Sequence, residues 1–346
     1  MRASPAAMGR GDSVTGSSFK EKVMRKMFML LAVLVFVVAA GQVSAGTLIT
    51  IAHGLPEDHS GHFGLVKFKE VVEKESKGEL TCEIFPNQQM GGDREMIEGV
   101  QLGNIMVGFT SSSPLAGFVK EFYVLDVPFM FPDRATAYAV LDGEAGKALE
   151  KTLESFNIKS LGYFENGFRN LTASCEVKSP DDLKGLKIRV MENKLHMLTW
   201  STLGANPTPL AFAELFTALQ QGTVDAQENP YELIYTNKFY EVQKNVMETN
   251  HIYTPFLAVM NLEFFEGLSP ELQDVVMKAA REAIEYQRKV AAEGEQKARA
   301  EIAKARPITV FTTEERQKFV DKMAPVHAEA AKLVGNQKIV DLFLKK

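Results

Sequence analysis

Two arginines and three histidines are the residues whose types and spacing could carry chemistry in this chain. Arg169 follows a predicted strand in the segment GYFENGFRN, and Arg189 lies inside the apolar segment LKIRV. In a strand, the side chain of Arg189 faces the opposite side from Ile188 and Val190, toward either solvent or a site. The chain is acidic, with a net charge of −5. An acidic protein that binds an anion needs such local arginines to overcome its own field.

The histidines allow two kinds of site. His53 ends the first predicted strand, and it is a candidate ligand contact because ligands of open α/β sheets lie outside the carboxyl ends of strands. His59 and His62 are three residues apart and would share one face of a helix, where they could hold a metal. No acidic or thiol co-ligands stand at a fixed spacing from them, which favours polar residues at a helix start. We therefore expect no metal and no cofactor.

Catalytic signatures are absent from the sequence. It contains no GxSxG, HExxH, Walker A or GxGxxG motif, and neither a nucleophile–base pair nor a metal-binding set is evident. We therefore expect a binding protein rather than an enzyme, with an exported enzyme on a similar scaffold as the competing interpretation. The negative net charge also argues against nucleic acid as a partner.

The elements that position these residues follow an alternating order. Strands are predicted at 48–52, 80–85 and 105–109, with helices at 61–77 and 93–102 between them. This β-α-β-α-β order is typical of a parallel sheet covered by helices.

A second unit with a similar pattern follows the first. Strands are predicted at 158–164, 186–190 and 223–226, and a helix at 212–220. The strand predicted at 257–261 could return to the first unit. Two α/β halves joined by more than one crossing predict a two-lobed binding protein, with its site in the cleft between the lobes.

A long helix should connect the two lobes. Ser269 is placed as its N-cap and Pro270 at its first position, and the pattern continues to about Lys304, roughly 50 Å at 1.5 Å per residue. Pro307 ends the helix before a last strand predicted at 308–311. The expected organisation is lobe I from 46–166 plus about 256–295, and lobe II from 167–255 plus about 296–346.

The two cysteines are expected to be unpaired. Cys82 lies in a predicted strand of lobe I and Cys175 follows a strand of lobe II, and they form no CxxC pair. Although the expected compartment is oxidising, a bridge between the lobes would hinder their closure.

Residues 1–45 have the features of a secretory leader. A basic cluster precedes a continuous apolar run at 27–40, which is shorter than the about 20 residues that span a bilayer. Val43-Ser44-Ala45 provides small residues at both recognition positions of a cleavage site. We expect cleavage after Ala45 and an exported product with a net charge of −9; an uncleaved N-terminal anchor is the alternative.

Four longer segments resemble one known family. They are MGGDREMIEGVQLG at 90–103, ENGFRNLT at 165–172, SPDDLKGLKIRV at 179–190 and GANPTPLAFAELFTALQQGTVDAQENP at 204–230. Over essentially its whole mature length, the chain resembles the DctP-type substrate-binding subunits of tripartite ATP-independent periplasmic (TRAP) transporters. The resemblance implies a two-lobed α/β periplasmic binding protein fold, with hinged lobes, a long spine helix and a cleft that closes on an organic acid.

The resemblance also implies roles for individual residues. Arg189 matches the family's main carboxylate clamp, which suits the bidentate geometry of a guanidinium toward a carboxylate. Arg169 matches a second arginine of the anion site, Asn229 an amide that hydrogen-bonds the ligand, and Phe212 an aromatic wall. A purely structural role is the alternative for each, above all for Phe212, since phenylalanine is usually a core residue.

Two positions depart from the sialic-acid-binding branch of that family. Glu192 stands where that branch has an amide, and the turn at 111–113 lacks its acid and arginine, while Asp93 retains the acid before the second helix. Acceptor groups suit hydroxyl donors and repel a second carboxylate. With His53, Asp93, Ser111 and Glu192 as further contacts, we expect a polyhydroxy monocarboxylate such as a uronic or aldonic acid.

Other interpretations remain open from the sequence. The ligand could be a four-carbon dicarboxylate whose two ends bind Arg169 and Arg189. The expected partners are the small and large membrane subunits of a TRAP transporter, and the chain is expected to be a monomer. A sensory receptor for a histidine kinase needs only the same closing cleft, so the sequence does not separate transport from sensing.

Overall fold

The computed structural model describes residues 1, 23–25, 27, 29 and 46–344. The residues from Gly46 onward belong to one compact unit, which carries the strands described below. The predicted cleavage site at 43–45 and most of the apolar run at 27–40 lie outside the described residues. Among the described residues, no helix is both long and apolar enough to cross a membrane.

Five strands form the first sheet, and the predicted β-α-β-α-β order is confirmed in it. The pairs β1–β2 and β1–β3 are parallel. The strand predicted at 257–261 returns to this sheet as β10 and pairs antiparallel with β3 and β4. The order is β2-β1-β3-β10-β4, with bounds Thr47–His53 for β1, Leu80–Phe85 for β2, Val107–Ser111 for β3, Ile158–Phe168 for β4 and Tyr253–Asn261 for β10.

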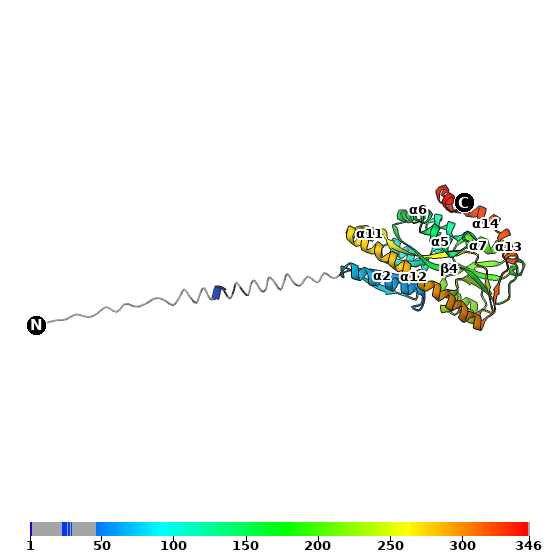
Figure 1. Cartoon of the computed structure of the whole chain (residues 1–346), viewed down its shortest axis with the longest axis horizontal. Coiled ribbons are helices and arrows are strands. Elements are labelled where there is room, and N and C mark those ends of the chain that lie inside the picture. The colour runs from blue at the N-terminus through cyan, green and yellow to red at the C-terminus, as the bar shows by residue number, and fades with distance from the viewer. Residues whose placement is uncertain (2–22, 26, 28, 30–45, 345–346) are drawn as a thin grey trace. The chain divides into compact units, whose positions relative to one another are not determined.

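Helices cover the first sheet because their apolar residues recur at helical spacing. The helix α2 spans Ser60–Glu75 and buries Leu65, Phe68 and Val72. The helix α3 spans Asp93–Gln101 and buries Met96, Ile97 and Val100. Figure 1 shows α2 running alongside the long helix α12, and the two helices contact each other.

Six strands form the second sheet, in the order β11-β9-β5-β8-β6-β7. Their bounds are Asn170–Ala173 for β5, Lys187–Val190 for β6, Asn206–Pro209 for β7, Ala226–Asn229 for β8, Asn245–Glu248 for β9 and Ile308–Val310 for β11. The strand predicted at 223–226 is wrong in position, because Gly222 is left-handed (φ 69°) and the N–H of Thr223 bonds to the carbonyl of Ala218. The chain is extended only after this turn.

The chain passes between the two sheets at Arg169 and again at residues 249–252. Arg169 separates β4 from β5, and residues 249–252 separate β9 from β10. We call the first sheet with its helices lobe I, and the second sheet with its helices lobe II. The expected lobe boundaries at 166/167 and about 255/256 stand next to these two crossings.

The predicted spine helix is α12, which spans Pro270–Ala305. The hydroxyl of Ser269 caps it by accepting the N–H of Leu272 at 3.3 Å. The first half of α12 contributes Val276 to the apolar cluster of lobe I, and the second half contributes Ile302 to a cluster of lobe II. One helix is therefore shared by both cores.

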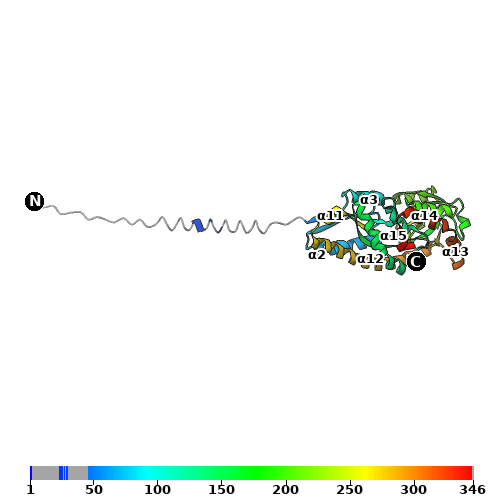
Figure 2. The same cartoon turned by 90° about the horizontal axis from the view of Figure 1, so that it is seen from above.

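The C-terminal helices pack more widely than the sequence predicts. The helix α14 (Ala324–Val334) contacts the 3-10 helix η1 (Lys120–Asp126) and α7 (Lys194–Thr202), and α15 (Gln337–Leu344) contacts α6 (Glu144–Glu150). Figure 2 shows α14 and α15 next to each other at this end of the chain. Residues 296–346 are expected wholly in lobe II, whereas these helices also lie on lobe I.

Shorter helices complete the fold. With η for a 3-10 helix, they are α4 Ser112–Leu115, α5 Arg134–Leu141, η2 Lys151–Phe156, η3 Pro180–Leu183, η4 Phe212–Glu214, α8 Leu215–Gln220, α9 Tyr231–Thr236, α10 Phe239–Val242, α11 Leu262–Gly267 and α13 Thr313–Asp321. The helix predicted at 212–220 is thus η4 followed by α8. Both cysteines are free: Cys175 is exposed, and Cys82 is buried, which raises its pKa to about 12.

Candidate functional site

A small cavity of about 40 Å³ lies between the two lobes. It is bordered by the carboxyl ends of β3, β6 and β8, where ligands of α/β proteins bind. Six of the eight predicted site residues line it: Asp93 and Ser111 from lobe I, Arg189, Phe212 and Asn229 from lobe II, and Arg169 from the crossing between them. Apolar side chains form the rest of the wall, among them Leu55, Phe109, Met191, Leu233 and Phe256.

Arg189 is fixed in place but keeps one nitrogen unused. Its Nε and Nη2 donate to the carbonyl of Leu210 at 2.9 and 2.7 Å, and its Cζ lies 5.9 Å from the centre of the Phe212 ring. Its Nη1 is buried without a hydrogen-bond partner among the described residues. The solvent-facing alternative is wrong, because Arg189 is only 3% exposed while Ile188 and Val190 fill the core on the other face.

Arg169 is occupied by a carboxylate of the protein itself. Its Nε and Nη2 donate to the two carboxylate oxygens of Glu228 at 2.5 and 3.1 Å, and both side chains are fully buried. Nη2 also donates to the side-chain oxygen of Asn229 at 3.0 Å. Burial by itself raises the pKa of Glu228, but the charge of Arg169 and hydrogen bonds from His196 and His251 hold this pKa well below its usual value. The positive charge of Arg169 is therefore compensated.

Asn229 and Phe212 border the cavity and also hold its arginines. The amide of Asn229 accepts from Arg169 and donates to Gln227 Oε1 at 2.6 Å, so one of its two N–H groups is committed. The Phe212 ring packs edge-on against Phe239, with 5.7 Å between the ring centres. Phe212 is thus a wall anchored in lobe II and not a fully buried core residue.

The lobe I side of the cavity presents acceptors and hydroxyl groups. The carboxyl of Asp93 accepts the backbone N–H of Ser111; burial raises its pKa to about 7, while the charge of Arg189 opposes that rise. The hydroxyl of Ser111 and the side-chain oxygen of Asn166 are buried without partners among the described residues. Asn166 was not predicted, although it lies in the segment ENGFRN three residues before Arg169.

The structure does not bring His53 into the cavity. His53 is fully buried, its Nδ1 accepts the N–H of Leu55 at 3.1 Å, and its Nε2 lies 3.0 Å from His62 Nδ1. Burial lowers its pKa to about 3, so the ring is neutral. His53 supports the loop that carries Leu55 to the cavity wall, because the last residue of β1 turns into the core.

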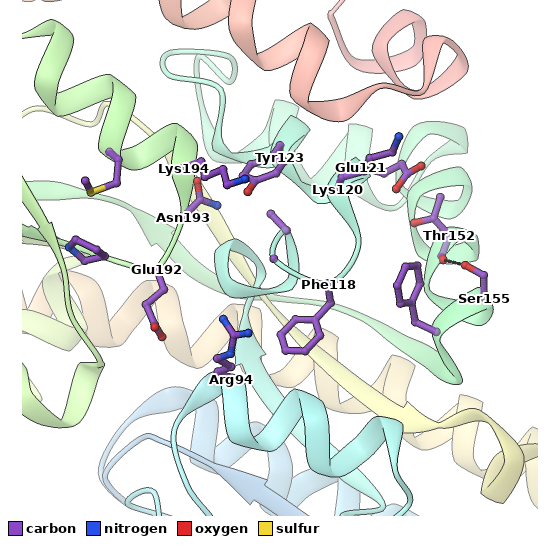
Figure 3. A pocket seen from close by; sticks show the side chains of 15 residues that line it. Arg94, Phe118, Lys120, Glu121, Tyr123, Thr152, Ser155, Glu192, Asn193 and Lys194 are labelled. Carbon is purple, nitrogen blue, oxygen red and sulfur yellow. Dashed lines mark hydrogen bonds between the residues drawn. The ribbon is translucent and has the colours of Figure 1, made fainter.

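Glu192 lies outside the cavity, at a larger groove of about 840 Å³ that Figure 3 shows. Both lobes line this groove, with Arg94 and Phe118 on one side and Glu192 and Lys194 on the other. A narrower space of about 110 Å³ shares Arg94 and Glu192 with the groove and Arg189 with the cavity. Glu192 therefore stands along a route from solvent to Arg189, and it is exposed.

The histidines considered for metal binding have other partners. His59 is the N-cap of α2, and its Nδ1 accepts the N–H of Gly61 at 3.0 Å. Across the residues that the structure describes, no group of three or more His, Cys, Asp or Glu side chains is arranged to hold a metal ion.

Comparison with known proteins gives one consistent family. A family model described as bacterial extracellular solute-binding protein, family 7, matches residues 51–333. The chain is 40% identical over 287 residues to the 2,3-diketo-L-gulonate-binding periplasmic protein YiaO of Escherichia coli, which covers 83% of this chain and 84% of that protein. It is 35% identical over 298 residues to the C4-dicarboxylate-binding periplasmic protein DctP of Rhodobacter capsulatus, covering 84% and 89% of the two chains.

Solved structures agree with this comparison. The sugar acid binding protein DctPAm of Advenella mimigardefordensis in complex with galactonate has a TM-score of 0.83 and 36% identity, covering 86% of this chain and 97% of that one. A TRAP periplasmic solute binding protein of Polaromonas bound to D-erythronate has a TM-score of 0.82 and 38% identity, covering 86% and 98%. One of Shewanella oneidensis with bound succinate has a TM-score of 0.83 and 32% identity, covering 87% and 99%.

We predict that Glu228→Gln lowers the free energy of unfolding by about 3–5 kcal/mol, because it leaves the buried guanidinium of Arg169 without its counter-charge. Urea unfolding at pH 7, followed by circular dichroism, measures the change. The control is Glu241→Gln, since Glu241 is exposed and its loss should cost no more than about 0.5 kcal/mol. Equal free energies of unfolding of the two variants would contradict the assignment of Glu228 as the counter-charge of Arg169.

The same pair predicts a pH dependence. Because the folded-state pKa of Glu228 lies below the ordinary value of 4.5, its stabilisation is fully present above that pH. It is lost as the pH falls below 4.5 toward the folded-state pKa. Between pH 6 and pH 3, the wild-type protein should therefore lose more stability than Glu228→Gln does, and parallel curves would argue against the pair.

Proposed function

Because the chain belongs to family 7 of the bacterial extracellular solute-binding proteins, we propose that it is a periplasmic receptor for a monocarboxylic sugar acid. The acid binds in the cavity between the lobes, and the closed receptor delivers it to the membrane subunits of a TRAP transporter. The family consists of transport receptors and not of enzymes.

The observation that carries the proposal is the unused nitrogen of Arg189. Two arginines line the cavity, but Glu228 compensates the charge of Arg169. No carboxylate is hydrogen-bonded to Arg189 among the described residues, although the charges of Asp93, Glu228 and Glu192 act on it. A ligand carboxylate can accept a charge-assisted hydrogen bond from Nη1, which satisfies this buried donor.

The remaining polar groups suit hydroxyl groups of a ligand. Ser111 and Asn166 present unpartnered oxygens, and Asp93 presents a carboxyl that already accepts one N–H. A sugar hydroxyl can donate to these oxygens and accept from the Ser111 hydroxyl, whereas a second carboxylate can only accept and would be repelled by the Asp93 carboxylate. The apolar wall around Phe109 and Phe256 fits the carbon–hydrogen faces of a sugar chain.

The relatives support both sugar acids and dicarboxylates as ligands of such a cavity. Galactonate, D-erythronate and 2,3-diketo-L-gulonate appear in the names of three of them, and succinate or C4-dicarboxylates in those of others. Only one arginine of this cavity lacks a hydrogen-bonded carboxylate among the described residues, which favours the first class. A four-carbon dicarboxylate would place its second carboxylate near Arg169, whose charge Glu228 already compensates.

The proposed receptor acts in the periplasm after its leader is removed. Cleavage after Ala45 releases the receptor into the periplasm, where the relatives of Escherichia coli and Rhodobacter capsulatus are placed by name. The receptor acts as a monomer, because each chain carries both lobes of its cavity.

A ligand panel tests the proposed function. We expect galactonate, gluconate, erythronate or glucuronate to raise the melting temperature. At a ligand concentration of 100 times the Kd, binding should add about 2.7 kcal/mol to the free energy of unfolding. Succinate, malate and neutral galactose serve as comparisons under the same conditions. Stabilisation by succinate or malate with no response to any sugar acid would reject the sugar-acid assignment and favour a dicarboxylate receptor.

We predict that Arg189→Lys weakens binding of the acid identified in that panel by about 2–5 kcal/mol, measured by calorimetry. Lysine keeps the charge but loses the planar fork that binds both Leu210 and a carboxylate. Arg94→Lys is the matched control, because Arg94 is exposed at the outer groove. Near-native affinity of the Arg189 variant would refute its role as clamp.

We predict that Asp93→Asn narrows the preference for a sugar acid over succinate about tenfold. The variant removes the carboxyl that would repel a second carboxylate from the lobe I side. Calorimetry with galactonate and succinate measures the ratio, and Glu98→Gln on the same helix is the control. An unchanged ratio would place Asp93 outside the determinants of ligand class.

A further inference from the structure

Glu232 joins the two lobes at a point outside the groups that face the ligand. It lies on α9, whose Tyr231 and Ile234 belong to an apolar cluster of lobe II. Its carboxylate accepts two hydrogen bonds from Ser60, the first residue of α2 in lobe I: the backbone N–H at 2.8 Å and the hydroxyl at 2.6 Å. This contact spans 172 residues of sequence, and Glu232 is only 8% exposed.

The contact completes the amino terminus of α2 from the opposite lobe. The N-terminus of a helix carries a partial positive charge and unpaired N–H groups, which a carboxylate stabilises. The first turn of α2 contains no acidic residue of its own, and the side chain of its N-cap His59 accepts the N–H of Gly61. Glu232 therefore supplies the acceptor for the N–H of Ser60. Burial raises the pKa of Glu232 to about 7, and the two hydrogen bonds from Ser60 oppose that rise.

The spine helix α12 is shaped to admit this carboxylate. Gly294 lies inside α12, where glycine costs about 1 kcal/mol relative to alanine. A Cβ atom at position 294 would stand 2.8 Å from Glu232 Oε1, which is too close. Gln287, also on α12, donates to the Ser60 hydroxyl at 3.3 Å and to the carbonyl of Glu165 at 2.8 Å. The helix shared by both lobes thus holds both partners of the contact.

The same short segment reaches the ligand cavity. Asn229 precedes Glu232 by three residues and Leu233 follows it directly, and both line the cavity. Leu233 also packs into the apolar cluster of lobe I. One short segment of the chain therefore reaches both the ligand cavity and the contact with Ser60.

We propose that Glu232 is a latch between the lobes, which binds the amino terminus of α2 in the closed receptor and releases it when the lobes separate. This inference rests on the proposed function, because ligand capture is what closure serves. Glu232 is a positioning residue: it touches no ligand, and it sets the fraction of receptor that is closed. Apparent affinity scales with that fraction, so the latch strengthens binding without a contact to the bound acid.

The test measures lobe separation and ligand release in the same protein. Fluorescent labels are placed at Glu70→Cys on α2 and Gln220→Cys on α8, in a chain with Cys175→Ser, because both labelled positions are exposed. Glu232→Gln keeps the size of the side chain and removes its charge. Ser60→Ala removes the hydroxyl that donates to Glu232. Ser269→Ala is the matched control, because it removes the N-cap hydroxyl of α12, which does not contact Glu232.

With galactonate, we expect Glu232→Gln to raise the dissociation rate and the Kd about tenfold, with a smaller effect of Ser60→Ala and none of Ser269→Ala. The double variant should be no weaker than Glu232→Gln alone, because both changes break one contact. Without ligand, the distribution of label distances should shift toward the open form. Unchanged dissociation rates and distances in a folded Glu232→Gln protein would refute the latch.

Two controls keep the outcomes separate. If Glu232→Gln does not fold, the dissociation rate and label distances of Ser60→Ala test the latch instead. This variant removes one hydroxyl and keeps the carboxylate of Glu232 at the amino terminus of α2. If the wild-type protein binds no acid, the proposed function fails, while the ligand-free distance distributions still support or refute the latch.

Discussion

A buried cation that no carboxylate of the described residues binds by a hydrogen bond is the constraint on which the rest of this structure depends. Arg189 is almost fully enclosed, and burial lowers its pKa to about 10, which leaves it charged at neutral pH. Burying a charge costs several kcal/mol, and the carbonyl of Leu210 and the nearby carboxylates of Asp93 and Glu192 offset part of that cost. In the proposed function, a ligand carboxylate adds the hydrogen bond that Nη1 of Arg189 lacks. This interaction would tie ligand binding to the position of Arg189 between the two lobes.

The neighbouring arginine shows why residue type alone does not define a site. Arg169 and Arg189 line the same cavity, but Glu228 neutralises the first with two hydrogen bonds and leaves the second free. The ion pair stands where the chain first crosses between the lobes, and His251, in the second crossing, donates to the same carboxylate at 3.0 Å. Arg169 is thus a buried support at the crossing, and it positions Asn229 through a hydrogen bond.

The two lobes are also joined by contacts outside the ligand cavity. The helix α12 packs into the cores of both lobes, so a rotation of one lobe is resisted along its length. Where α9 meets α12, Gly294 leaves room for Glu232 to reach the amino terminus of α2. If the proposed latch holds, the energy of closure is divided between a ligand-dependent part at Arg189 and a ligand-independent part at the contact of Glu232 with Ser60. Such a division lets a receptor bind its ligand firmly and still open again for release.

Much of the fold follows from local patterns in the sequence. Alternating apolar strands and helices, the Ser269-Pro270 start of α12 and the return of the strand at 257–261 depend on periodicity and capping, which act over a few residues. Five of the eight predicted residues lie both in the matched motifs and at the cavity, and Ser111 joins them from the carboxyl end of β3. Tertiary structure decided the rest. His53 turned into the core, Glu192 stayed at the outer groove, and Asn166 joined the cavity through the packing of β4 beside β10. Whether an arginine is free or paired depends on Glu228, which lies 59 residues from Arg169, and no local pattern carries that information.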